Sequence, residues 1–89
     1  MIKGTTASGF AFKIDESVLM DMEFIELAAE AADNGLVLPK LLSFILGDTQ
    51  KKKLYDHVRT KAGRVPADAV NKEVEDILSA IRENKETKN

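Results

Sequence analysis

His57 is the only histidine in the sequence, and histidine is the side chain best suited to acid–base chemistry near neutral pH. A general base must lie within hydrogen-bond reach of a nucleophile or of a group that orients it. On the helix expected here, its neighbours Asp56 and Val58 point in other directions. The sequence therefore favours a histidine on the surface of a helix over a catalytic one.

Three glutamates, Glu23, Glu26 and Glu30, follow a spacing of three and four and would line one face of a helix. Hard cations prefer several oxygen ligands in a tight loop, and the sequence has no signature of such a loop. The five glycines are scattered, which disfavours a phosphate-binding loop, and with no cysteine there is no thiol nucleophile and no thiolate metal site. We expect no enzyme activity, no metal and no cofactor.

The length of 89 residues predicts a single domain. No run approaches the roughly 18 consecutive apolar residues of a membrane-spanning helix, so we expect no membrane association. The start of the chain, from Met1 to Thr6, lacks the features of a secretory signal. These observations lead us to expect a cytoplasmic protein.

The residues around which the others are expected to pack lie between Leu36 and Gly47. Pro39 suits the first turn of a helix, and Gly47 can adopt the positive φ that ends one. The segment between them is apolar around most of the helix, at Leu41, Leu42, Phe44, Ile45 and Leu46. A helix of this kind must be covered on several sides, and the other elements are its expected cover.

The segment from Gly9 to Asp15 alternates, with Phe10, Phe12 and Ile14 on one face, and predicts a strand. Residues 2–8 are expected to pair with it as a hairpin. The two phenylalanines are expected in the core, although anchors for a partner would have the same spacing.

Helices are predicted before and after the central segment. One runs from a cap at Asp15 or Ser17 to about Asp33 and ends through positive φ at Asn34–Gly35. A second runs from Asp48 to Gly63, and the last starts at Val65–Pro66. The expected inward residues of the first helix are Val18, Met22, Ile25, Ala29 and Ala32, in a set widened by Leu19, Met20, Phe24, Leu27 and Ala28. Those of the later helices are Leu54, Tyr55, Val58 and Ala62, then Val70, Val74, Ile77, Leu78 and Ile81.

The predicted fold is therefore mainly α. It has about four short helices behind a short N-terminal β-strand or hairpin, in a single domain over residues 1–82. Residues 83–89 are wholly polar and predict a disordered tail.

Charge is distributed unevenly along the chain. Residues 1–49 carry a net charge of −5 and residues 50–89 a net charge of +3. This polarity favours head-to-tail contact between copies, although a solvated surface has the same pattern. The order of elements also suggests a helix-turn-helix motif, in which a helix is followed by Gly47–Asp48 and then by a second helix that begins with Lys51, Lys52 and Lys53. The overall net charge of −2, however, disfavours nucleic-acid binding.

The order of several short motifs resembles one known family. These motifs are Gly9-Phe10-Ala11-Phe12-Lys13-Ile14-Asp15, Asp21-Met22-Glu23-Phe24-Ile25-Glu26-Leu27, Leu38-Pro39-Lys40-Leu41-Leu42, Ile45-Leu46-Gly47, Gln50-Lys51, Leu54-Tyr55-Asp56-His57 and Gly63-Arg64-Val65-Pro66. In this order and spacing, from about Gly9 to Ile81, the chain resembles the tail assembly chaperones of long, non-contractile-tailed phages and prophages of Gram-positive bacteria.

The resemblance implies a small helical protein in the cytoplasm of the infected cell. Such chaperones coat the tape measure protein, keep it soluble before the tail tube polymerises, and are absent from the mature virion. A longer frameshifted form recruits tail tube protein, and related members assemble as a spiral. The family has no set of invariant binding residues, so the resemblance assigns no binding residue in this sequence.

Two candidate contact sites follow from the residues themselves. An apolar surface for self-association or client binding would comprise Leu36, Leu38, Leu41, Phe44 and Ile45. A contact for an acidic partner would comprise Lys51, Lys52 and Lys53. The alternatives are another small phage structural or assembly protein, a helix-turn-helix DNA-binding regulator and, least favoured, a small enzyme.

Overall fold

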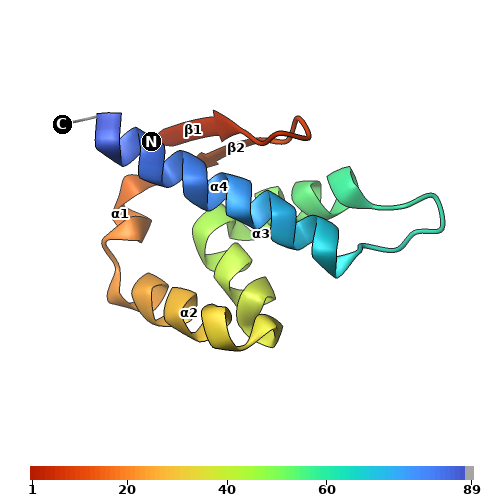
Figure 1. The fold of residues 1–89 in the computed structure, drawn as a ribbon, viewed down its shortest axis with the longest axis horizontal. Coiled ribbons are helices and arrows are strands. Elements are labelled where there is room, and N and C mark those ends of the chain that lie inside the picture. The colour runs from red at the N-terminus through yellow and green to blue at the C-terminus, as the bar shows by residue number, and fades with distance from the viewer. Residues whose placement is uncertain (88–89) are drawn as a thin grey trace.

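The computed structural model describes residues 1–87 as four helices and an N-terminal hairpin (Figure 1). Strands β1 (Ile2–Thr5) and β2 (Ala11–Ile14) precede the short helix α1 (Glu16–Leu19). Helix α2 (Met22–Asp33), the 3-10 turn η1 (Gly35–Val37), helix α3 (Leu38–Val58) and helix α4 (Ala67–Thr87) follow. The predicted mainly α fold with an N-terminal hairpin is confirmed.

The hairpin is antiparallel, with Ile2 opposite Ile14 and Gly4 opposite Phe12. Its inner face contributes Ile2, Phe12 and Ile14 to the core, and Phe10 is buried beside them, as the alternating pattern predicts. Gly4 is required by the packing, because a Cβ there would lie 2.8 Å from Cζ of Phe12. The phenylalanine ring therefore covers the opposite strand.

Helix α3 is the centre of the core and contacts β2, α1, α2 and α4. Gly47 interrupts it with φ +78° and ψ 163°, so the expected break lies where the sequence places it. The segment before the break buries Leu41, Leu42, Ile45 and Leu46, and the segment after it buries Leu54. Figure 1 shows α4 crossing in front of α3, while α2 lies lower in the view, beside the start of α3.

Gln50 joins the break in α3 to the hairpin. Its amide nitrogen donates to the carbonyl oxygens of Leu46 and Lys13, at 2.8 Å each. Its amide oxygen accepts from the Lys13 backbone nitrogen at 2.9 Å. One side chain thus satisfies a carbonyl at the break and both backbone groups of an edge-strand residue.

The prediction of one helix from Asp15 to Asp33 is wrong. Asp15 does cap a helix, but α1 ends at Leu19, and Asp21 caps α2 by accepting from the Glu23 backbone nitrogen at 2.7 Å. The second cap starts a new helix, because the Asp21 carboxylate accepts from the Glu23 amide, which a continuous helix would bond to the carbonyl oxygen of Leu19.

This break also changes the buried face. Met22 and Ile25 were expected inside, yet they are 63% and 49% exposed. The residues of this region that pack against the core are Val18, Leu19, Phe24, Leu27, Ala28 and Ala31, and all of them except Ala31 belong to the expected set.

Two further boundaries differ from the predictions. Helix α2 does end before Asn34, but Asn34 is extended at φ −138°, and its side chain accepts from the Leu36 backbone nitrogen to start η1. Helix α3 ends at Val58, so Ala62 lies in the following loop, where Gly63 has φ +86°. Capping and turn hydrogen bonds, and no glycine, therefore decide where these two helices end.

The last helix follows the predicted stripe. Val70, Val74, Ile77 and Ile81 are buried, and Leu78 is packed against them. Helix α4 ends at Thr87 and so extends into residues 83–89, the segment that the sequence predicts as a polar tail. Residues 88 and 89 lie outside the described part, and the disorder of that segment stays a prediction.

The cap at Asp15 predicts a pH effect. Hydrogen bonds from the backbone nitrogen and the hydroxyl of Ser17, at 3.0 and 2.9 Å, lower the pKa of the Asp15 carboxyl below its ordinary value. Its stabilising effect is therefore present above the pKa of the unfolded chain and is lost as pH falls through the lowered pKa of the folded protein. Urea unfolding of wild type and Asp15→Asn should differ at neutral pH and converge in acid. A difference that grows on acidification would contradict this assignment.

Candidate functional site: apolar interaction surfaces

The five residues of the predicted apolar site do not form one surface. Leu41 and Ile45 are buried in the core at 2% and 4% exposure, because the hairpin and the other helices already cover them. Leu36 is 88% exposed, whereas Leu38 and Phe44 are half-buried and line two different grooves. Only Leu36, Leu38 and Phe44 are therefore accessible to another molecule.

The first groove, here called the apolar groove, has a volume of about 520 Å³. It lies where η1 and the start of α3 meet Tyr55 and the start of α4. Its lining is Gly35, Leu36, Leu38, Pro39, Tyr55, Val65, Ala67, Val70 and Asn71. Grooves of about 300–1,000 Å³ with mostly apolar linings are typical of binding sites. Leu36 stands at its edge as an unburied apolar anchor.

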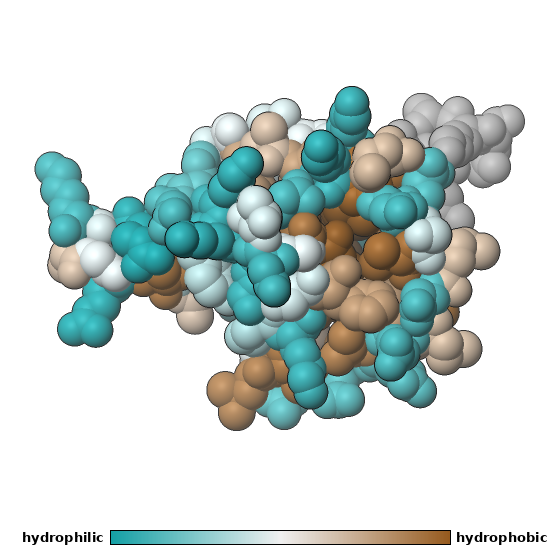
Figure 2. Space-filling model, turned by 180° about the vertical axis from the view of Figure 1, so that it is seen from behind, coloured by the Kyte–Doolittle hydropathy of each residue, from teal (hydrophilic) through white to brown (hydrophobic). Residues whose placement is uncertain are grey.

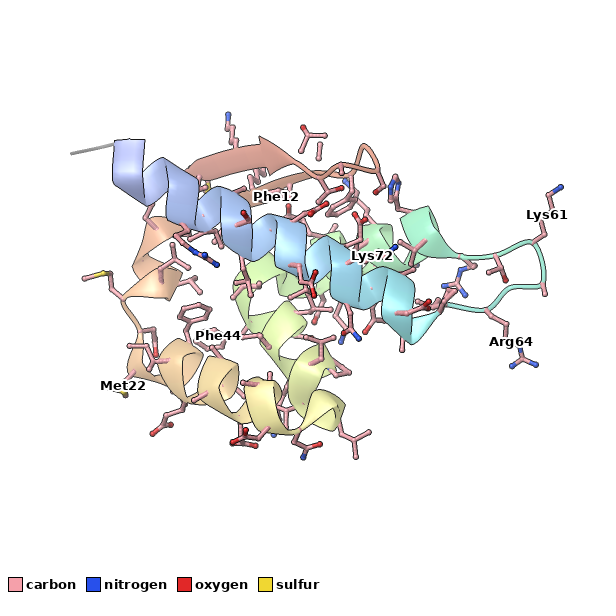
Figure 3. All side chains as sticks on the ribbon, viewed as in Figure 1. Phe12, Met22, Phe44, Lys61, Arg64 and Lys72 are labelled. Atoms are coloured by element: carbon pink, nitrogen blue, oxygen red, sulfur yellow. The ribbon has the colours of Figure 1, made fainter. Side chains whose placement is uncertain are left out.

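A second apolar area, here called the methionine surface, consists of Met20, Met22 and Ile25. Their exposed fractions are 80%, 63% and 49%. Figure 3 shows Met22 pointing away from the body of the molecule at the start of α2. Methionine is flexible and polarisable and recurs at surfaces that accept varied partners. This surface was missed by the sequence analysis, since periodicity assigned Met22 and Ile25 to the core.

Apolar side chains also reach the surface on the rear face (Figure 2). They gather on the half of the molecule opposite the protruding loop between α3 and α4, and polar side chains surround them. An apolar area with a polar rim is the usual pattern of a protein interaction site.

The three predicted contact lysines point in different directions. The Lys51 ammonium donates to the Ser43 hydroxyl at 2.8 Å and lies 5.8 Å from the centre of the Tyr55 ring. Lys53 instead lines a shallow groove beside the hairpin together with Lys3 and Lys13. Successive residues of a helix are turned by about 100°, so a run of three cannot form one flat patch. An acidic partner at Lys51, Lys52 and Lys53 stays a prediction.

His57 lies on the surface of α3 but has a partner that the sequence did not indicate. Its Nε2 is 2.9 Å from the Ser8 hydroxyl oxygen at the hairpin turn, and its ring is 5.6 Å from that of Phe10. Ser8 donates its single hydroxyl hydrogen to Glu73 at 2.8 Å, so it accepts from a protonated Nε2 of His57. In this arrangement His57 does not act as a base toward Ser8.

The carboxylate of Glu73 holds this polar cluster together. Glu73 is 4% exposed and also accepts from the hydroxyl of Thr6 at 2.7 Å, while Thr6 accepts from the Phe10 backbone nitrogen at 3.1 Å. Ala7 donates to Asp76 at 3.0 Å one turn further along α4. These bonds fasten the hairpin turn to α4, which is a structural role.

Other chemistry is limited within the described residues. Among residues 1–87, no group of three His, Cys, Asp or Glu side chains is placed to hold a metal ion. Over the same range, none of the helices is both long enough and apolar enough to span a membrane. No family model, no curated protein and no solved structure matches this chain.

The polar cluster predicts a large effect at Glu73. Glu73→Leu should lower the free energy of unfolding by about 1–3 kcal/mol, because the buried Thr6 hydroxyl loses its acceptor. Glu75→Leu makes the same exchange two residues along α4 at an exposed position and should change it by less than about 0.5 kcal/mol. Urea denaturation of both variants measures the difference. Equal effects would show that the cluster does not stabilise the fold.

Proposed function

We propose that this chain is a tail assembly chaperone, which binds the tape measure protein of a long-tailed phage and keeps it soluble before the tail forms. The proposal includes a homo-oligomeric coat and a role in the cytoplasm of the bacterial host. It also includes recruitment of tail tube protein through a longer form. It is based on the order of motifs from Gly9 to Ile81 and on the surfaces that the fold leaves uncovered.

One observation carries the proposal. The region from Met20 to Leu36 keeps four large apolar side chains at least 49% exposed, namely Met20, Met22, Ile25 and Leu36. Burying a fully exposed apolar side chain contributes about 1.5–3 kcal/mol, and each of these four would contribute in proportion to its exposed part. A long helical client with an apolar stripe would cover these four side chains, in the same way that an amphipathic helix places its apolar face in a groove.

The small size of each surface fits a coat made of many copies. A single contact of one apolar groove and three exposed side chains is weak by itself, because association also costs translational and rotational freedom. Many copies on one client raise the overall affinity through effective concentration. A weak, repeated contact also suits a chaperone that must leave before the tail is complete.

The alternatives receive less support. A helix-turn-helix regulator needs its basic residues on one recognition face, whereas Lys51 is engaged with Ser43 and Lys53 lies beside the hairpin. Another small phage structural protein is compatible with the same exposed surfaces. It differs by remaining in purified particles, so analysis of mature virions separates the two proposals.

Co-expression with the tape measure protein encoded nearest to this chain tests the function. Wild type should keep the client soluble and co-purify with it in many copies. The double variant Met22→Asp/Leu36→Asp should reduce the soluble client about tenfold, because two exposed anchors become charged. Both positions are exposed, so the variant is expected to fold normally.

The charge-matched control is Thr49→Asp/Ser79→Asp, at two exposed polar positions of α3 and α4. It should behave like wild type. Circular dichroism and urea unfolding establish that both double variants are folded. An insoluble client with wild type, also in the presence of the longer form, would contradict the proposal, as would equal behaviour of the two double variants.

A further inference from the structure

The loop between α3 and α4 carries two cations, Lys61 and Arg64, without a side-chain partner among residues 1–87. Its segment from Arg59 to Arg64 protrudes from one end of the molecule (Figures 1 and 3). Lys61 and Arg64 point away from the body in Figure 3. Neither side chain has a hydrogen-bond or ion-pair partner among the described side chains. We call this segment the basic loop.

Internal hydrogen bonds fix the shape of the basic loop. The Thr60 backbone nitrogen donates to the Arg64 carbonyl oxygen at 2.8 Å, and the Gly63 nitrogen donates to the Thr60 carbonyl oxygen at 2.9 Å. The Arg59 guanidinium donates to the Gly63 carbonyl oxygen at 3.0 Å and pairs with Asp56. Because this conformation already exists in one copy, little ordering is required for the loop to bind.

A groove of opposite charge lies between α2 and the first half of α3. This acidic groove has a volume of about 460 Å³ and is lined by Glu23, Glu26, Leu27, Glu30, Lys40, Ser43 and Phe44. Its three carboxylates have no side-chain partner among the described residues, and with Lys40 they leave a net charge of minus two. Leu27 and Phe44 supply an apolar part of the lining.

We propose that the basic loop of one copy binds in the acidic groove of a second copy. The two unpaired cations of the loop match the net charge of the groove. The stems of Lys61 and Arg64 would lie on Leu27 and Phe44, where a cation near the phenylalanine ring gains further attraction. The groove volume of about 460 Å³ has room for two long side chains of a loop.

The contact must be between copies, because the two sites lie at different ends of the molecule. The protein measures 44 Å along its longest axis, with the basic loop at one end and the start of α2, marked by Met22, toward the other (Figure 3). A contact that joins two different surfaces can repeat from copy to copy into an open array or a ring, unless two copies exchange loop and groove reciprocally. The inference rests on the proposed function for its biological meaning, since it supplies the link within the proposed coat.

The test uses the full chain alone, without a client. Analytical ultracentrifugation should show concentration-dependent association at about 0.01 M salt and its loss at about 1 M salt, where the Debye length falls from about 30 Å to 3 Å. The groove variant Glu26→Gln/Glu30→Gln and the loop variant Lys61→Gln/Arg64→Gln should each associate about tenfold more weakly. A mixture of the two, at a concentration where each alone is monomeric, should form a one-to-one dimer and nothing larger.

The mixture is decisive because it contains one intact loop on one variant and one intact groove on the other. The charge-matched controls Asp68→Asn/Glu75→Gln and Lys3→Gln/Lys72→Gln change exposed residues elsewhere and should associate like wild type. A monomeric wild type at low salt would overturn the proposal. So would unchanged association of the groove and loop variants, or a mixture that stays monomeric. These readouts involve no tape measure protein, so their failure is distinct from a failure of the proposed function.

Discussion

The first half of α3 is apolar on nearly all sides, and the rest of the fold covers it. Leu41, Leu42, Ile45 and Leu46 cannot all face one neighbour, so the hairpin, α1, α2 and α4 each cover part of the helix. Gly47 then turns the chain, and Gln50 bonds both to the carbonyl of Leu46 and to the backbone of Lys13. The break in the helix and the position of the hairpin therefore depend on one another.

The packing of the other elements around α3 leaves several apolar side chains exposed to solvent. Because Asp21 starts a new helix, α2 turns Phe24 and Leu27 toward the core and Met22 and Ile25 toward solvent. The turn η1 likewise leaves Leu36 exposed beside the apolar groove. The proposed client surface is thus a consequence of how α2 is attached to the core, and the acidic groove between α2 and α3 is the proposed site for a neighbouring copy.

The elements that have a strong apolar periodicity or a helix-breaking glycine could be predicted from the sequence. The alternation of Phe10, Phe12 and Ile14, the stripe from Val70 to Ile81 and the break at Gly47 each have one structural solution. The break before Asp21 could not be predicted in this way, because the apolar spacing from Val18 to Ala32 fits an unbroken helix equally well. The Asp21 cap competed with that spacing, and this cap decided the structure.

Polar contacts between residues far apart in the sequence could not be predicted, for a different reason. Glu73 and Thr6 are separated by 67 residues, and no local pattern indicates that they meet. The same holds for His57 with Ser8 and for Gln50 with Lys13. The predicted apolar site failed to form one surface because two of its members, Leu41 and Ile45, are required by the core. Burial depends on which elements pack together, and a single element's sequence does not specify it.

Hydrogen–deuterium exchange on the chain, alone and in complex with a tape measure fragment, tests the central claim most directly. Client binding at the methionine surface and the apolar groove should slow exchange in α1, α2 and η1 and at the start of α4. Exchange in β1 and β2 should stay unchanged. Protection confined to the hairpin, or no protection in a complex that does form, would contradict the proposed client surface.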